Sequence, residues 1–212
     1  MIVKVCGVRT AEIAAAAVDA GADWIGVVLE PRSPRHAVAT DVVAVRAAVR
    51  GRAAVVGVLV ATPGQDLDAI AVEHRLDALQ VHGDITPAAV AAAVVPVIRA
   101  LNPALPLDLA TLDWPASAPV LVDAAPSPDG LPGGTGRRVD LDAAAALAAH
   151  RPVLLAGGLG PDTVAAAVRR VLPWGVDASS GLESSPGVKD ATLVAAYVTA
   201  ARGALAATVD GP

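Results

Sequence analysis

Short apolar runs alternate with alanine-rich segments along the whole chain. The apolar runs have the composition of strands buried on both faces, and the intervening segments are rich in helix formers. This alternation predicts repeated strand-helix units around a parallel sheet. The expected strands are Ile2–Val5, Trp24–Leu29, Ala54–Val60, Ala78–Val81, Val97–Leu101, Val120–Val122, Val153–Leu155 and Trp174–Val176. The expected helices lie near Ala11–Ala20, Ala39–Arg50, Asp66–His74, Pro87–Val94, Leu141–Ala149, Pro161–Val171 and Asp190–Ala204.

Eight such units in 212 residues leave little room for anything beyond a strand, a helix and two tight loops each. A doubly wound sheet would normally use five or six strands and place its glycine-rich turn after the first one. Here the glycine-rich turns follow the last two strands. The sequence therefore predicts the α/β class and a single (β/α)8 TIM-barrel domain over residues 1–212, with the connection Asn102–Pro119 left unassigned.

Two small-residue turns follow the last two expected strands and are suited to hold an anion. Gly157 and Gly158 follow one strand, and Ser179, Ser180 and Gly181 follow the next. Glycine allows backbone to approach a ligand closely, and a turn that opens onto a helix presents unpaired N–H groups. Paired loops at this end of a barrel are a usual phosphate site, so we expect these residues to bind one.

Composition and charge narrow the class of protein. Hydrophobic residues make up 54% of the chain, which demands a large core and excludes disorder. The net charge of −5 argues against nucleic-acid binding, and no apolar run of about 18 residues predicts a membrane span. The chain starts directly in a strand without a targeting segment, so we expect a cytoplasmic protein. One cysteine excludes an internal disulfide and a multi-cysteine metal site.

Reactive side chains follow two of the expected strands, at the end of a barrel where active sites form. Cys6 is compatible with a small core residue, but at the barrel mouth beside cations its thiolate would be favoured and would act as a general base. Asp123 is compatible with a helix cap or a salt-bridge partner. In an apolar mouth its charged form would be destabilised, which would keep a proton available for donation.

Other residues at the same mouth suit substrate binding. Arg35 is either a solvated loop cation or a bidentate clamp for a carboxylate. His82 is either a satisfied strand-end histidine or a binding residue, and nothing stands at metal-ligand spacing to it. Gly133 and Gly134 belong to a loop whose length and position fit closure over a ligand.

These residues together resemble the phosphoribosylanthranilate isomerase family over nearly the whole chain. Each motif is weak alone, but their ordered set is specific. The similar segments are Lys4-Val5-Cys6-Gly7, Gly21–Gly26, Ser33-Pro34-Arg35-His36, Gln80-Val81-His82-Gly83, Val122-Asp123, Pro132–Gly136, Leu155–Leu159, Gly175–Glu183 and Gly187–Asp190.

The resemblance implies a (β/α)8 barrel that converts N-(5-phosphoribosyl)anthranilate to 1-(2-carboxyphenylamino)-1-deoxyribulose 5-phosphate in tryptophan biosynthesis, by an Amadori rearrangement. It implies that Cys6 is the base, that Asp123 is the acid and that Arg35 contacts the anthranilate carboxylate. It places the phosphate at Gly158 and the turn from Ser179 to Gly181. It implies no cofactor and no metal, a small phosphoribosyl substrate as the only partner, and a monomer or homodimer.

Alternatives remain at this stage. Val27, Val28 and Leu29 replace aromatic residues that the family often carries, which leaves open a related barrel isomerase acting on another phosphorylated aminosugar. A non-catalytic phosphosugar-binding paralogue is the alternative from another class, although both Cys6 and Asp123 are retained. A sugar-phosphate aldolase or the indole-forming enzyme of the pathway would need a Schiff-base lysine or a set of Lys and Glu residues, and the only lysines are Lys4 and Lys189.

Lys4 should point the same way along its strand as Cys6, which makes it a candidate to lower the pKa of the thiol. Asp177 is expected to point away from the pocket or to support the phosphate turn.

Overall fold

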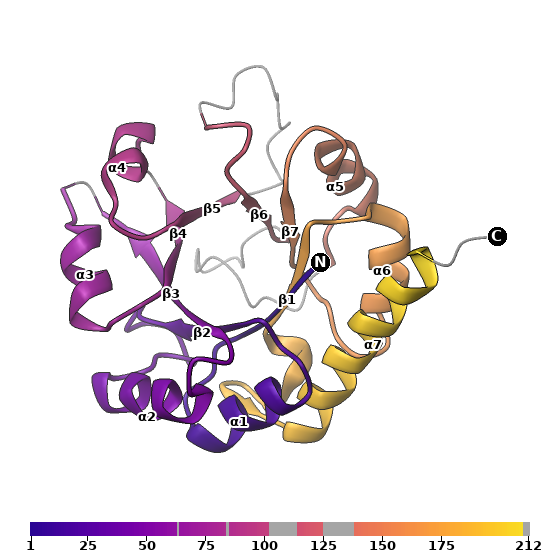
Figure 1. Ribbon diagram of the computed structural model, residues 1–212, viewed down its shortest axis with the longest axis horizontal. Coiled ribbons are helices and arrows are strands. Elements are labelled where there is room, and N and C mark those ends of the chain that lie inside the picture. Colours follow the sequence, from indigo (N-terminus) through magenta and orange to yellow (C-terminus); the bar gives the residue numbers. More distant parts are fainter. Residues whose placement is uncertain (63, 84, 102–113, 125–137, 210–212) are drawn as a thin grey trace.

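The chain folds into a closed barrel of parallel strands with helices around its outside (Figure 1). The computed structural model describes residues 1–62, 64–83, 85–101, 114–124 and 138–209. In this part of the chain, strands β1 to β8 follow one another around the barrel in sequence order, and β8 pairs with β1 to close it. The predicted (β/α)8 barrel is confirmed.

The elements lie close to their predicted positions. The barrel strands are β1 (Ile2–Cys6), β2 (Trp24–Val28), β3 (Ala54–Ala61), β4 (Ala78–Gly83), β5 (Val97–Leu101), β6 (Val120–Val122), β7 (Val153–Leu155) and β8 (Gly175–Ala178). The helices are α1 (Ala11–Asp19), α2 (Ala39–Val49), α3 (Leu67–Glu73), α4 (Pro87–Ala92), α5 (Leu141–Ala148), α6 (Val164–Val171) and α7 (Ala191–Val209).

The predicted start of α6 was wrong, and the segment before α7 carries elements that were not predicted. The helix α6 begins at Val164 and not at Pro161, because the carbonyl of Gly160 accepts the N–H groups of both Thr163 and Val164 and the intervening residues form a turn. The segment after β8 carries a 3₁₀ turn, η1 (Ser180–Leu182), and a short hairpin of β9 (Glu183–Ser185) and β10 (Val188–Lys189). Strands of three and two residues carry too little periodic pattern to be predicted.

Side-chain oxygens fix the starts of several helices. Thr10, Asp66 and Thr86 each accept a hydrogen bond from the backbone N–H three residues later, which satisfies one of the unpaired donors of the first turn. Pro87 occupies the first turn of α4, as expected. These short caps hold the helices in place between tight loops.

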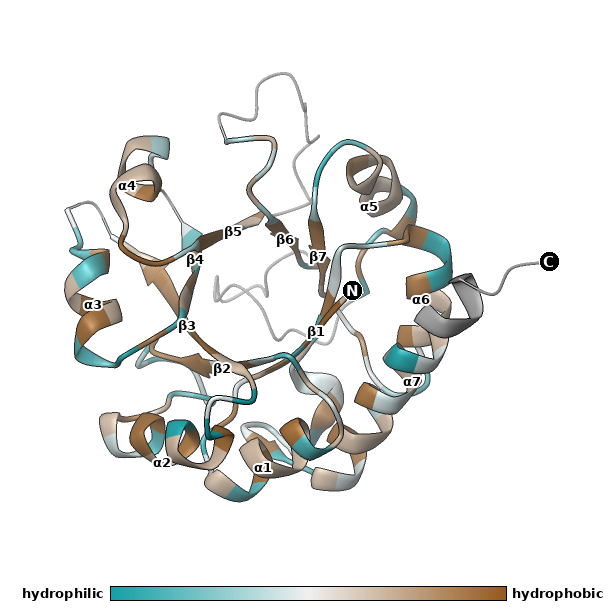
Figure 2. Cartoon of the chain, viewed as in Figure 1, coloured by the Kyte–Doolittle hydropathy of each residue, from teal (hydrophilic) through white to brown (hydrophobic). Residues whose placement is uncertain are grey.

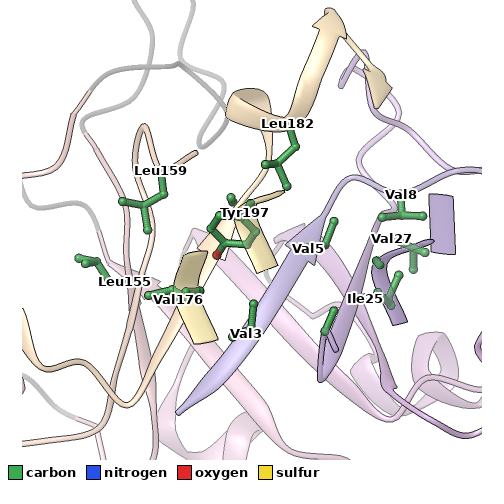
Figure 3. Packing of buried hydrophobic residues seen from close by; sticks show 14 of the residues in the cluster. Val3, Val5, Val8, Ile25, Val27, Leu155, Leu159, Val176, Leu182 and Tyr197 are labelled. Atoms are coloured by element: carbon green, nitrogen blue, oxygen red, sulfur yellow. The ribbon is translucent and has the colours of Figure 1, made fainter. Parts of the chain in front are cut away.

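Alternate residues of each strand face opposite sides of the barrel wall. The outward residues of β1 and β8, such as Val3, Val5 and Val176, are fully buried, and Tyr197 of α7 lies among them (Figure 3). Figure 2 shows the hydrophobic colour on the strands and the hydrophilic colour in loops and on outer helix faces. Burying each such side chain contributes about 1.5–3 kcal/mol.

The lumen of the barrel is filled differently at its two ends. A small apolar cluster fills part of it, from residues in the first half or middle of their strands and from Ala156 directly after β7: Val56, Ala78, Ile98, Leu121, Leu154 and Ala156. Polar and charged side chains lie above it, toward the carboxyl ends of the strands. This division leaves the polar chemistry at the end where active sites of barrels form.

The first and last parts of the chain meet where β1 pairs with β8. Lys4 lies opposite Asp177 in that register. Arg202 of α7 donates to the backbone carbonyls of Met1 and Gly21 and to the carboxylate of Asp23, at 2.9, 2.8 and 2.6 Å. The C-terminal helix therefore anchors the first strand.

Candidate active site

Cys6 is the last residue of β1 and points into the lumen. Its side chain lies against Val28 and Val58, and the residue is 5% exposed. Burial raises the pKa of the thiol, and the positive charge of Lys4 works in the opposite direction. Gly26 of the neighbouring strand β2 leaves room for the Cys6 side chain, because a Cβ at that position would lie only 2.9 Å from the sulfur.

Asp123 follows β6 directly, so it also lies at the carboxyl end of a strand. Its Oδ1 accepts the N–H of Ala124 at 2.7 Å. Burial raises the pKa of the Asp123 carboxyl to about 6, although that hydrogen bond favours the charged form. The charges of Asp177 and Lys4 affect the pKa values of both Cys6 and Asp123.

A chain of hydrogen-bonded side chains lies across the lumen. The Nζ of Lys4 donates to Oδ1 of Asp177 at 3.0 Å and to Oε1 of Gln80 at 2.8 Å. The Nε2 of Gln80 lies 3.1 Å from Nε2 of His82. Burial lowers the pKa of His82 to about 4, and the charge of Lys4 adds to this, so the imidazole is neutral at neutral pH. The amide of Gln80 then donates to His82, which leaves the imidazole proton on Nδ1.

The position of Asp177 differs from the expectation. Its side chain was predicted to point away from the pocket or to support the phosphate turn, whereas it is buried in the lumen and forms an ion pair with Lys4. The alternation of β8 contained the signal, because Asp177 and the inward-facing Gly175 are two residues apart. A buried cation on β1 required an anion on a neighbouring strand.

Arg35 lies in the loop after β2 and is held by the hairpin that follows β8. Its Nε and Nη2 donate to the two carboxylate oxygens of Glu183 at 2.7 and 2.9 Å. Lys189 also donates to Glu183, and the Gly187 N–H donates to it at 3.2 Å. Burial works to raise the pKa of Glu183, but the hydrogen bonds from Arg35 and Lys189 outweigh it and lower that pKa. Sequence reasoning named Arg35 but assigned no role to Glu183 or Lys189.

The two small-residue turns meet above β7 and β8. Gly157 and Gly158 have φ values of +86° and +69°, a backbone conformation that favours glycine. Ser180 begins η1, and a Cβ on Gly181 would lie 2.2 Å from the carbonyl oxygen of Leu159, so the two turns are in contact.

Ser179 connects the second turn to the residues around Cys6. Its Oγ donates to the Cys6 carbonyl at 3.2 Å, and Lys189 Nζ lies 3.4 Å from the same Oγ. The turn predicted to hold an anion is thus joined to the strand that carries the thiol. Gly133 and Gly134, the remaining predicted binding residues, lie outside the described residues.

Neither a metal centre nor a membrane span is evident in the described part of the chain. No cluster of three or more His, Cys, Asp and Glu side chains there could hold a metal ion. None of the helices described is both long and apolar enough to cross a membrane.

Comparisons with known proteins agree with the geometry. The profile of the family described as N-(5'phosphoribosyl)anthranilate (PRA) isomerase matches residues 3–200. The N-(5'-phosphoribosyl)anthranilate isomerase of Roseiflexus sp. is 46% identical, over 95% of this chain and 98% of that protein. The phosphoribosyl anthranilate isomerase of Thermus thermophilus, a crystal structure, superimposes with a TM-score of 0.82 at 32% identity, over 97% of this chain and 98% of that one.

A second solved structure holds a ligand. It is a phosphoribosyl anthranilate isomerase in complex with reduced 1-(o-carboxyphenylamino)-1-deoxyribulose 5-phosphate. It has a TM-score of 0.79 and 27% identity to this chain, covering 96% of this chain and all of that one.

Proposed function

The chain belongs to the N-(5'-phosphoribosyl)anthranilate isomerase family, and we propose that Cys6 is the general base and Asp123 the general acid of its reaction. The reaction converts N-(5-phosphoribosyl)anthranilate to 1-(2-carboxyphenylamino)-1-deoxyribulose 5-phosphate, a step of tryptophan biosynthesis. The observation that carries the proposal is the pair itself: one thiol ends β1 and one carboxyl directly follows β6, so both lie at the carboxyl end of the barrel strands.

The first step opens the ribose ring. The anilino nitrogen pushes electrons toward C1, the bond between C1 and the ring oxygen breaks, and that oxygen takes a proton from Asp123. The raised pKa of Asp123, about 6, supports this role because a protonated carboxyl is retained closer to neutral pH than at an exposed aspartate. The product of this step is a Schiff base whose C1–N double bond carries the positive charge.

The second step removes the proton from C2. The adjacent iminium acidifies that C–H bond, and the Cys6 thiolate accepts the proton while the electron pair forms a C1–C2 double bond. The nitrogen becomes neutral, giving an enolamine. Loss of the C2 hydroxyl proton and protonation of C1 then give the ketone. Transfer of one proton from the Cys6 thiol to the Asp123 carboxylate, through solvent, restores the thiolate and the carboxylic acid, so atoms and charge balance without a cofactor.

The rest of the site would fix the substrate across the barrel mouth. We propose that Arg35 binds the anthranilate carboxylate, a role supported by the fixed position that the bidentate ion pair with Glu183 gives its guanidinium group. The N–H groups of the two turns, at Gly157 and Gly158 and from Ser179 to Gly181, would bind the phosphate. His82 would contact the sugar between them, and Gly133 and Gly134, also predicted to bind substrate, lie outside the described residues. Anchoring both ends places the reacting carbons between acid and base.

The test is a Cys6→Ala variant assayed by the loss of anthranilate fluorescence. A general base contributes about 10²–10⁴-fold, so the variant should lose that factor in kcat. It should still bind the reduced product analogue, which shows that the fold and the anchoring groups are intact. Full turnover by the variant would refute the base, and tight analogue binding by a wild-type chain that converts no substrate would favour the non-catalytic paralogue.

A further inference from the structure

Lys4 is a fully buried lysine in the barrel lumen, two residues before Cys6 on the same face of β1. Its ammonium group is fixed from two sides by Asp177 of β8 and Gln80 of β4. The steps above give neither Lys4 nor Asp177 a contact with the substrate. Burying a charge pair is expensive, and apolar residues of similar volume often serve stability equally well, so packing alone does not explain the pair.

The third neighbour of the ammonium group is the thiol. A Cβ placed on Gly26 would lie 2.9 Å from the Cys6 sulfur and 3.1 Å from Lys4 Nζ, so those two atoms lie within about 6 Å of each other. An opposite charge at about 4–6 Å stabilises an ionised group, and strongly so where water is excluded. The positive charge of Lys4 favours the thiolate.

The base needs this help because its surroundings favour the neutral thiol. Burial raises the pKa of Cys6, and the carboxylate of Asp177 raises it further. Lys189 of the β10 hairpin lowers it to a lesser extent than Lys4. Among the described residues, the other titratable or charged groups near this mouth are His82 of β4, Asp123 after β6, Arg35 of the β2 loop and Glu183 of β9. Tyr197 of α7 lies on the outer side of the barrel wall.

We propose that Lys4 is a positioning residue: Asp177 and Gln80 hold its ammonium group beside Cys6, where it favours the thiolate that removes the substrate proton. The assignment rests on the proposed function of Cys6 as base. Asp177 has a double effect, because it keeps Lys4 protonated and in place while its own negative charge disfavours the thiolate. The two members of the ion pair therefore act on Cys6 in opposite directions.

This opposition gives a test that a merely structural role would not satisfy. Cys6 is the only cysteine of the chain, so the ultraviolet absorbance of its thiolate can be titrated directly, with Cys6→Ser as the blank. Asp177→Asn keeps an acceptor for Lys4 and removes the negative charge. The double variant Lys4→Met/Asp177→Asn removes both charges and leaves neither one buried alone, so it keeps the experiment informative where Lys4→Met fails to fold.

The expected shifts have opposite signs. Asp177→Asn should lower the pKa of the Cys6 thiol, and the double variant should raise it by one unit or more, because an opposite charge at this range shifts a pKa by about 1–3 units. Arg46→Met, which removes an ion pair with Asp77 far from the thiol, should leave the titration unchanged. The proposal would be overturned if the thiol pKa were unchanged or lowered in the double variant, or if it were raised in Asp177→Asn.

Turnover separates this proposal from the proposed function. The limb of the isomerase kcat/KM profile against pH that reports ionisation of Cys6 should shift together with the thiolate titration in each variant. If the wild-type chain converts no substrate while the thiolate titrations shift as described, the proposed function fails and the coupling of Lys4 to Cys6 stands. If the chain is an active isomerase whose thiol titrates identically in all variants, the coupling is refuted.

Discussion

Replacing Asp123 with asparagine should make the protein more stable and much less active. In the folded chain burial raises the pKa of this carboxyl from 3.8 to about 6. Each unit corresponds to about 1.4 kcal/mol of preference for the neutral form, so the charged carboxylate costs the folded state up to about 3 kcal/mol. Asparagine has the same shape, carries no charge and still accepts the Ala124 N–H.

The pH dependence distinguishes this cause from others. A raised pKa means that the folded state binds the proton more tightly, so the cost is complete above the folded pKa of about 6. It fades as the pH falls toward 3.8 and is lost below that pH, where the carboxyl is neutral in both states. The free energy of unfolding of Asp123→Asn should therefore exceed that of the wild type at about pH 8, and the two should converge at about pH 4.

The assay is urea unfolding of both proteins at the two pH values, with Asp142→Asn as the control. Asp142 is an exposed partner of Arg170, so its replacement should change stability by less than about 1 kcal/mol at either pH. In parallel, Asp123→Asn should lose about 10²–10⁴-fold in kcat, since asparagine cannot give a proton to the ring oxygen. A variant that is less stable than the wild type at about pH 8, or equally stabilised at both pH values, would refute the argument.

Three further substitutions test other parts of the site and its frame. Glu183→Gln should raise KM at least about tenfold with a smaller change in kcat. The reason is that this carboxylate holds Arg35, and hydrogen bonds to charged groups contribute ~1.5–3 kcal/mol. An unchanged KM in steady-state kinetics would contradict this. Gly181→Ala should abolish the stabilisation that inorganic phosphate gives in thermal unfolding. The new Cβ would lie 2.2 Å from the Leu159 carbonyl oxygen and would push apart the two turns proposed to bind phosphate. Protection by phosphate equal to that of the wild type would be the contrary result. Arg202→Met should lower the free energy of unfolding, measured from denaturant curves, by about 1–3 kcal/mol, because it removes the hydrogen bonds that anchor the first strand. No loss of stability would show that the anchor is unimportant.

The sequence was sufficient for the barrel because its pattern is local and repeated. Strands such as Val97–Leu101 and Val120–Val122 lie at their predicted bounds, since a short apolar run between helix formers has few other solutions in a parallel sheet. The predicted mouth residues Cys6 and Asp123 follow from the same regularity, because every strand of a barrel ends on one side.

The contacts between distant loops were not predictable in the same way. Glu183 holds Arg35 across 148 residues, and no local pattern connects them. Asp177 was placed outside the pocket because its partner Lys4 is 173 residues away, and only the closure of the barrel brings them together. Helix boundaries such as Val164 depended on a turn whose hydrogen bonds involve Gly160, which strand and helix periodicity does not report.

The pairing of the first strand with the last has a consequence for biogenesis. During synthesis β1 emerges from the ribosome well before its second neighbour β8, so one edge of the growing sheet stays open until β8 has been made. If β1 and β8 paired one residue out of register, Lys4 and Asp177 would no longer face each other in the lumen. The buried charge pair thus disfavours a misaligned barrel. Pairing of β8 with β1 both closes the barrel and brings Asp177 to Lys4 beside Cys6.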